Sequence, residues 1–96
     1  MSATVAELIA ANKVVVFSWV TCPFCVRAKE LLKPLAKDLR VYECDQMPNG
    51  EDLRKEIFSK YGHETVPAIF INGEFIGGCS ELQALQRSGG LTKKLS

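Results

Sequence analysis

The segment Val14–Ser18 constrains the fold of this chain of 96 residues more than any other feature of its sequence. Its first four residues are all apolar, so polar and apolar side chains do not alternate along it. A strand with this continuous pattern is buried on both faces of its sheet. Covering both faces requires helices on either side of the sheet, which indicates an α/β protein.

Helical patterns stand on both sides of this strand. Thr4-Val5-Ala6-Glu7 has the form of a capping box, and the helix that it begins should end near Asn12, a residue that tolerates a left-handed turn. Apolar residues on one helical face predict a second helix from Pro23 to about Leu39. Pro34 lies within that pattern and should kink the helix or shorten it.

The rest of the chain alternates between strands and helices. Val41–Cys44 is expected to form a short second strand. A third helix should follow the Asn49-Gly50 turn, with an apolar face that includes Leu53 and Ile57, and should end at Gly62.

A hairpin and a last helix complete the predicted elements. Ala68–Ile71 and Glu74–Ile76 are expected to pair as antiparallel strands, because Asn72-Gly73 between them is a strong signal for a two-residue hairpin turn. Ser80–Gln83 offers a second capping box, and the helix that it begins should end at Gly89-Gly90.

This order of elements predicts the topology. A strand–helix–strand crossover followed by a hairpin implies a mixed four-stranded sheet flanked by helices on both faces. Neither a linker nor a repeat interrupts the pattern, so residues 1–96 are expected to form a single domain.

Charge and hydropathy restrict the partners and the location. Lys plus Arg number 12 and Asp plus Glu number 11, so neither nucleic acid nor an anionic membrane is expected as a partner. The apolar runs are far shorter than a bilayer span, and the N-terminus lacks the pattern of a secretory signal. We therefore expect a cytoplasmic protein.

Cys22 and Cys25 lie where the first strand gives way to the second helix. Proline is favoured at the first helical position, so Pro23 makes Cys22 the N-cap of that helix. The backbone N–H groups of Phe24 and Cys25, together with the helix dipole, should then stabilise a Cys22 thiolate. Cys25, one turn further along, would remain an ordinary thiol and would resolve the mixed disulfide that Cys22 forms.

A structural zinc site is the alternative for such a cysteine pair, but zinc requires four ligands. The other candidates, Cys44, Cys79 and His63, stand alone and lack the spacing of ligand pairs. We therefore expect no metal site. Cys44 and Cys79 are expected to be inert, and His63 to be a solvated loop residue.

Three motifs together carry a resemblance to a known family: Cys22-Pro23-Phe24-Cys25, Thr65-Val66-Pro67 and Gly77-Gly78-Cys79-Ser80. In this order and spacing they resemble a dithiol glutaredoxin of the thioredoxin-fold superfamily. The resemblance covers essentially the whole chain. It implies a thioredoxin-like fold and a glutathione-dependent thiol–disulfide oxidoreductase that reduces protein disulfides and glutathionylated proteins.

The resemblance also implies how the reaction is divided. Cys22 would be the nucleophile and Cys25 the resolving thiol, and the two would form a redox-active disulfide. The partners would be glutathione, or a related low-molecular-weight thiol, and protein disulfides. No cofactor is implied beyond glutathione as co-substrate, and the simplest expectation is a monomer.

A set of residues is assigned to glutathione by the same resemblance: Trp19, Phe24, Arg54, Thr65, Val66, Pro67, Gly78, Cys79 and Ser80. A cis peptide bond before Pro67 would present the Val66 backbone to the cysteinyl part. The helix N-terminus at Gly78 would bind the γ-glutamyl carboxylate, which suits the anion preference of such sites. The Ser80 hydroxyl would bind ligand or cap the helix, and Phe24 would form an aromatic wall.

Two of these residues depart from the family pattern. Trp19 stands where a Lys or Arg commonly helps to hold the glycine carboxylate, and an indole cannot replace that charge. Partial burial beside the site is its alternative role. Arg54 stands where Gln is frequent, and it either binds the carboxylate in compensation or is a solvated helix residue.

A second function is compatible with the motifs: a dimeric scaffold for a [2Fe–2S] cluster, ligated by the first cysteine and by glutathione. Trp19 favours this alternative because it departs from the reductase pattern. Pro23 opposes it, since a small residue at this position suits cluster binding better in the family that the motifs resemble. A thioredoxin is disfavoured because its Trp-Cys-Gly-Pro-Cys pattern is absent.

Overall fold

The computed structural model describes residues 3–95 and contains a mixed four-stranded sheet with the strand order β2-β1-β3-β4. β1 (Val14–Ser18) pairs in parallel with β2 (Leu39–Glu43) and antiparallel with β3 (Ala68–Ile71). At the far edge, β4 (Glu74–Gly77) pairs antiparallel with β3. The predicted mixed sheet is therefore confirmed, with β1 in its interior.

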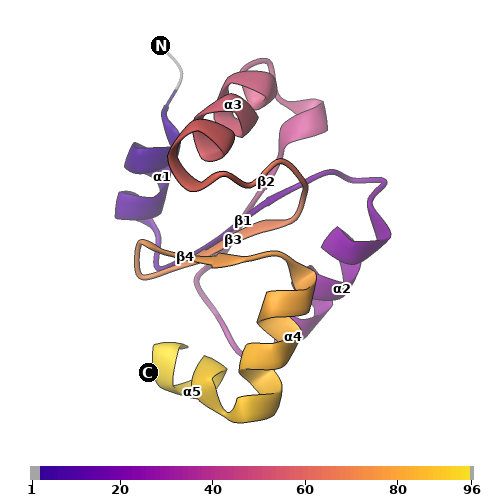
Figure 1. Cartoon of the computed structure of the whole chain (residues 1–96), viewed down its shortest axis with the longest axis vertical. Helices are drawn as coiled ribbons and strands as arrows, with labels where there is room; N and C mark the ends of the chain where they lie inside the picture. The colour runs from indigo at the N-terminus through magenta and orange to yellow at the C-terminus, as the bar shows by residue number, and fades with distance from the viewer. Residues whose placement is uncertain (1–2, 96) are drawn as a thin grey trace.

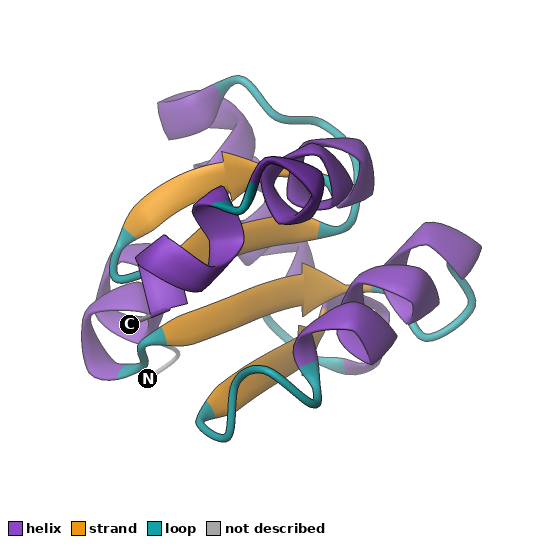
Figure 2. Cartoon of the chain, turned by 90° about the horizontal axis from the view of Figure 1, so that it is seen from below, coloured by secondary structure: helices purple, strands orange, loops and turns teal. Residues whose placement is uncertain are grey.

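Helices cover both faces of this sheet (Figure 1). One face carries α1 (Val5–Ala11) and α3 (Gly50–Tyr61), and the other carries α2 (Pro23–Leu32), α4 (Cys79–Ser88) and α5 (Gly90–Leu95). Figure 2, seen from below, shows the strands side by side between these helices. A short 3₁₀ helix, η1 (Cys44–Gln46), connects β2 to the segment before α3.

β1 is buried on both faces, as its sequence predicts. Val14 and Val16 pack with the residues of α2, α4 and α5, whereas Val15 and Phe17 pack with those of α1 and α3. All four side chains are completely buried. Burial of such a side chain contributes about 1.5–3 kcal/mol, so β1 is a firm base for the loop that follows it.

The second predicted helix is too long. α2 ends at Leu32 rather than near Leu39, because Pro34 lacks an amide hydrogen and its ring clashes with the preceding turn. The chain returns to the sheet earlier than expected, and β2 begins at Leu39 instead of Val41. Cys44, predicted to be in this strand, lies in η1 instead.

The C-terminal region contains a helix that the sequence pattern did not predict. Gly89 ends α4 in a left-handed conformation, with a φ of 81°, as expected. α5 then begins at Gly90, because Leu91 turns back into the core and is only 1% exposed. Lys13 Nζ donates to the Leu95 carbonyl oxygen at 2.6 Å and ties this helix to the start of β1.

Asn12 ends α1 as predicted, but in an extended conformation, with φ −134°. Its side-chain amide caps the helix instead, by donating to the Leu8 carbonyl oxygen at 3.0 Å.

None of the helices between residues 3 and 95 combines the length and the hydropathy needed to cross a lipid bilayer.

Candidate active site

Cys22 is the N-cap of α2, with Pro23 at the first helical position, as predicted. The predicted orientation of its sulfur is wrong, however. Within the described chain, no backbone N–H group of α2 caps Cys22 Sγ. The thiol instead faces the Val66 carbonyl oxygen at 3.8 Å, so the half-buried nucleophile candidate points across to the loop before β3.

The loop between β1 and α2 is fixed by its own hydrogen bonds. The Val20 backbone N–H donates to both carboxylate oxygens of Asp45 at 3.2 Å. The Cys22 N–H donates to the Trp19 carbonyl oxygen at 3.1 Å. These contacts hold Cys22 at the N-terminal end of α2, where the helix dipole favours negative charge.

Cys25 lies behind Cys22 and is completely buried. Burial raises the pKa of the Cys25 thiol to about 11, although a hydrogen bond with the Trp19 backbone acts in the opposite direction. Cys25 is therefore a protonated thiol at neutral pH. Both cysteines are free in this structure, so the pair is described in its reduced, dithiol form.

The loop facing Cys22 contains the cis peptide bond that the resemblance implies, between Val66 and Pro67. His63 supports this loop, since its Nε2 donates to the Pro67 carbonyl oxygen at 3.1 Å. Its ring also packs edge-on against Phe75, with 5.2 Å between the ring centroids. The prediction that His63 is a solvated loop residue is therefore wrong.

The N-terminus of α4 is capped differently from the prediction. Gly78 is the N-cap, and its backbone N–H donates to Glu81 Oε1 at 2.6 Å. Ser80 is not the capping residue but an exposed side chain in the first helical turn. Gly77 has a φ of 120°, and a Cβ atom there would lie 2.8 Å from the Glu81 side chain.

Glu81 is thus a site residue that sequence reasoning missed. Its signal was present, because Glu81 stands three residues after Gly78, the spacing at which an N3 carboxylate accepts from the backbone N–H of the N-cap. The first N–H groups of any helix lack intrahelical partners, so those of Cys79 and Ser80 are oriented for an anion. The site therefore places helix N–H donors beside a carboxylate.

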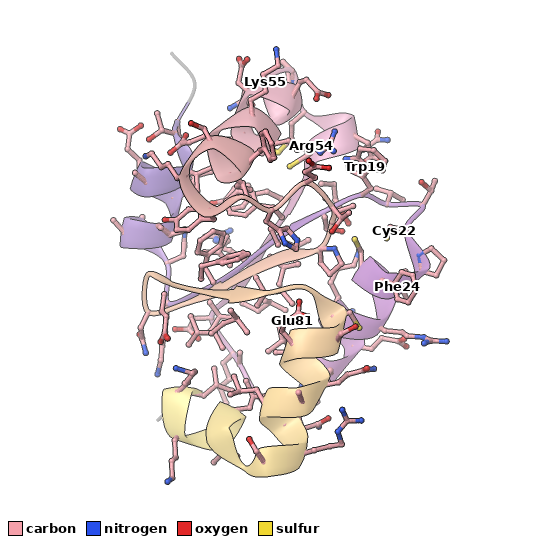
Figure 3. All side chains as sticks on the ribbon, in the orientation of Figure 1. Trp19, Cys22, Phe24, Arg54, Lys55 and Glu81 are labelled. Carbon is pink, nitrogen blue, oxygen red and sulfur yellow. The ribbon has the colours of Figure 1, made fainter. Side chains whose placement is uncertain are left out.

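Trp19 and Arg54 lie against each other near Cys22 (Figure 3). The guanidinium carbon of Arg54 is 4.7 Å from the centre of the Trp19 ring. Arg54 also donates to the Glu64 carbonyl oxygen at 3.0 Å and to Glu51 Oε1 at 3.3 Å. Trp19 is partly buried. Arg54 is also partly buried, and its guanidinium is fixed by these contacts rather than freely solvated.

Phe24 forms an exposed aromatic surface directly after the nucleophile candidate. Its side chain is 57% exposed, and Val20 in the preceding loop is 48% exposed. The Arg27 guanidinium lies 5.9 Å from the Phe24 ring centroid. An apolar surface with an adjacent cation therefore borders Cys22 on the side of α2.

The two remaining cysteines are buried. Burial raises the pKa of the Cys44 thiol to about 11 and also raises the pKa of the Cys79 thiol. Neither is a thiolate at neutral pH. Among residues 3–95, no group of three or more His, Cys, Asp or Glu side chains is arranged to hold a metal ion.

The buried thiols make the stability of the reduced protein depend on alkaline pH. Cys25 and Cys44 keep their protons in the fold until about pH 11, whereas a thiol with the ordinary pKa of 9.0 loses its proton earlier. The unfolded state therefore releases protons first, and the free energy of unfolding should fall as pH rises from 9.0 through about 11.

Thermal melts of the reduced protein across this range will test that expectation. The Cys44→Ala variant removes one of the two titrating groups, so its melting temperature should fall less steeply with pH. Equal slopes for the variant and the native protein would contradict the assigned role of Cys44.

A cavity of about 330 Å³ lies away from these residues, between the end of α1 and the β3–β4 turn. It is lined by Asn12, Lys13 and Asn72 among others and includes none of the predicted site residues. The candidate chemistry is concentrated instead where α2, the Val66-Pro67 loop and α4 meet.

Comparison with known proteins agrees with this arrangement. The glutaredoxin family model matches residues 14–76, which is more than half of the chain. Glutaredoxin-2 of Schizosaccharomyces pombe is 42% identical over 94 residues, covering 98% of this chain and 86% of that protein.

Solved structures give the same result. The dithiolic glutaredoxin 2-C-Grx1 of Trypanosoma brucei brucei has a TM-score of 0.92 and 59% identity, covering 100% of this chain and 98% of that one. A buckwheat glutaredoxin–glutathione complex has a TM-score of 0.90 and 34% identity, covering 94% of this chain and 82% of that one. Similarity of sequence and of structure thus extends over nearly the whole chain, and the protein belongs to the glutaredoxin family, with its thioredoxin-like fold.

Proposed function

We propose that this protein is a glutathione-dependent thiol–disulfide oxidoreductase that reduces glutathionylated proteins and protein disulfides. One observation carries the proposal: Cys22, accessible at the N-terminus of α2, lies in front of Cys25, which burial keeps as a thiol. A helix N-terminus favours a thiolate nucleophile, and a neutral second thiol does not repel it.

The site also offers matching groups for the parts of glutathione. The Val66 backbone lies opposite Cys22 Sγ, where the cysteinyl part must lie for its sulfur to react. The N–H groups of Cys79 and Ser80 suit the γ-glutamyl carboxylate, and the Glu81 carboxylate suits the adjacent ammonium group. A buckwheat relative has been solved in complex with glutathione, which supports this ligand.

The remaining assigned residues complete this placement. Arg54 would bind the glycine carboxylate, because its guanidinium is anchored to the Glu64 carbonyl oxygen and lies beside the Val66-Pro67 loop. Phe24 would cover the ligand as an apolar wall, and Thr65 lies beside Val66 on the same loop. Gly78 leaves room for the ligand to approach the backbone.

Reduction of a glutathionylated protein needs only Cys22. Its thiolate attacks the glutathione sulfur, the mixed S–S bond breaks, and the substrate sulfur leaves as a thiolate that takes up a proton. A second glutathione thiolate then attacks the glutathionyl sulfur on Cys22. That step releases oxidised glutathione and restores the Cys22 thiolate.

Reduction of a protein disulfide also needs Cys25. Cys22 first forms a mixed disulfide with the substrate, and Cys25 then loses its proton and attacks the Cys22 sulfur. The reduced substrate leaves, and the Cys22–Cys25 disulfide is reduced by two glutathiones. Burial raises the pKa of Cys25 to about 11 in the reduced protein, so Cys25 must lose a proton before it attacks, whereas the route through glutathione does not use it.

The Cys25→Ser variant separates the two routes. Turnover of a glutathionylated peptide with excess glutathione should stay within about twofold of the native rate, since that route does not use Cys25. Reduction of a protein disulfide should fall by more than about 100-fold, because the mixed disulfide is no longer resolved internally.

Both rates should be measured on the same preparations, with Cys44→Ala as a matched control that removes a buried cysteine outside the site. A Cys25→Ser variant inactive on the glutathionylated peptide would contradict the route through Cys22 alone. A native protein inactive on both substrates would overturn the proposed function.

The setting of the enzyme is part of the same proposal. A cytoplasmic location supplies the reducing conditions and the glutathione that the dithiol site requires. A monomer is sufficient, because Cys22, Cys25 and the proposed glutathione-binding groups all come from one chain.

A further inference from the structure

Trp19 stands three positions before Cys22, directly after β1, and is the single tryptophan of the chain. Its indole carries one N–H donor and no charge, so it cannot bind a carboxylate as a cation does. The structure shows what it contacts instead: the Arg54 guanidinium lies over its ring, 4.7 Å from the ring centre. A planar cation on an aromatic face is a favourable arrangement.

The other contacts of Arg54 leave its position incompletely determined. The ion pair with Glu51 is long, at 3.3 Å, and the Glu51 side chain is 69% exposed, so this pair contributes little. The hydrogen bond to the Glu64 carbonyl oxygen, at 3.0 Å, anchors one end of the guanidinium but does not set its plane. The third contact of Arg54 is the Trp19 ring, which lies under the guanidinium.

Trp19 is itself well placed to act as a support. Its carbonyl oxygen accepts the Cys22 N–H at 3.1 Å, and the next residue, Val20, is held by Asp45. Its side chain packs beside the core of α1 and α3. The position of the ring is therefore tied to the backbone that carries the nucleophile.

Arg54 lies at the boundary of the proposed glutathione site. With Thr65 and Val66 it lines a small cavity beside the loop that faces Cys22. A guanidinium has five N–H donors, and the contacts with Glu51 and Glu64 leave others for a ligand. The Glu51 carboxylate meanwhile forms an ion pair with the same guanidinium.

We propose that Trp19 is a positioning residue: its ring holds the Arg54 guanidinium in the plane that receives the terminal carboxylate of the thiol substrate, while Glu51 competes for the same cation. This inference rests on the proposed function, since it concerns recognition of the glycine end of glutathione. In this protein, binding of the glycine carboxylate would then depend on Arg54 alone, because position 19 carries an indole instead of the second cation that is common in the family.

The test compares two unreactive ligands, S-methylglutathione and its glycinamide, which lacks the terminal negative charge. Native protein should bind the acid about 10-fold or more tightly than the amide, because a charge-assisted hydrogen bond is lost. The Trp19→Leu variant, which keeps apolar bulk but loses the ring face, should weaken binding of the acid about fivefold and leave the amide unchanged.

Four further variants sharpen the comparison. Trp19→Phe keeps an aromatic face and should restore part of the lost affinity for the acid. Arg54→Lys keeps the charge but not the planar guanidinium with its paired N–H donors. It should also weaken binding of the acid and leave binding of the amide unchanged. Glu51→Gln should strengthen binding of the acid about twofold, since the competing carboxylate is gone. Lys55→Gln is the matched charge control, because Lys55 points away from Trp19 (Figure 3).

Two readouts distinguish positioning from a general structural role. In turnover of a glutathionylated peptide, Trp19→Leu should raise the KM for glutathione about fivefold and keep kcat within twofold. Because Trp19 is the only tryptophan, its fluorescence reports the stack directly. S-methylglutathione should change that fluorescence in the native protein and change it less in Arg54→Lys.

The inference is overturned if Trp19→Leu weakens binding of the acid and binding of the amide equally, because Trp19 would then be only an apolar wall of the site. It is also overturned if Glu51→Gln weakens binding of the acid. Binding of the two ligands is measured without turnover, so an inactive native protein would overturn the proposed function while the Trp19 inference is still decided by the affinities.

Discussion

The Cys22→Ser variant is expected to lose turnover of glutathionylated peptides by at least about 1000-fold, the largest effect of any single substitution on activity. A serine hydroxyl at the same N-cap position is not ionised at neutral pH, even beside the helix N-terminus. It cannot form the mixed disulfide with glutathione on which the following step depends. Loss of the sulfur therefore removes both proposed routes together.

This result should come without a loss of folding. Cys22 is half-buried, and Ser is a preferred N-cap residue, so the melting temperature should stay within a few degrees of the native value. Cys44→Ala serves as the control, since it removes a cysteine from the core but not from the site. Activity of Cys22→Ser within tenfold of the native enzyme would show that another group is the nucleophile.

Gly50→Ala is expected to produce the largest loss of stability, by more than about 3 kcal/mol. Gly50 begins α3 and is buried against η1. A Cβ atom at this position would lie 1.8 Å from the carbonyl oxygen of Cys44, and a backbone atom cannot move aside as a side chain can. α3 would have to shift away from the sheet, with the loss of its packing.

Thermal unfolding measures this effect, and the melting temperature should fall by more than about 12 °C. Gly89→Ala is the matched control, because it meets no atom within 4 Å and changes only the left-handed conformation at a φ of 81°. That variant should lose about 1–2 kcal/mol. Similar losses for the two variants would show that the close contact at Gly50 is relieved without cost.

The parts of the fold that could be predicted are those whose signals are local. The continuous apolar run of β1 required cover on both faces, and the Asn72-Gly73 turn defined the hairpin that follows β3. Pro34 correctly predicted a shortened helix. The exact end of α2 at Leu32 could not be placed, because the apolar spacing continues to Leu39 and Pro34 indicates a shorter helix without fixing its last residue.

The parts that could not be predicted depend on contacts between distant segments or on competing local signals. The family resemblance assigned Trp19 and Arg54 to the same carboxylate, but it did not predict that Arg54, on α3, lies over the Trp19 ring. At α4, Gln83 after Ser80 and Glu81 after Gly78 both have the spacing for an N3 side chain to cap the helix, and the hydrogen bond between Gly78 and Glu81 is the one that forms. The double glycine ends α4 as its signal indicates, but nothing in that signal predicts α5, which begins at Gly90 and buries Leu91.

The position of β1 also affects how the chain can fold during synthesis. Its antiparallel partner is β3, and Val14 lies opposite Ile71, which is far from it in the sequence. Until β3 has been made, one long edge of this apolar strand has no partner, and such an edge pairs readily with other chains. A fragment ending at Gly62 should therefore aggregate, and a ribosome-bound chain should reach its native sheet only after the last third has emerged.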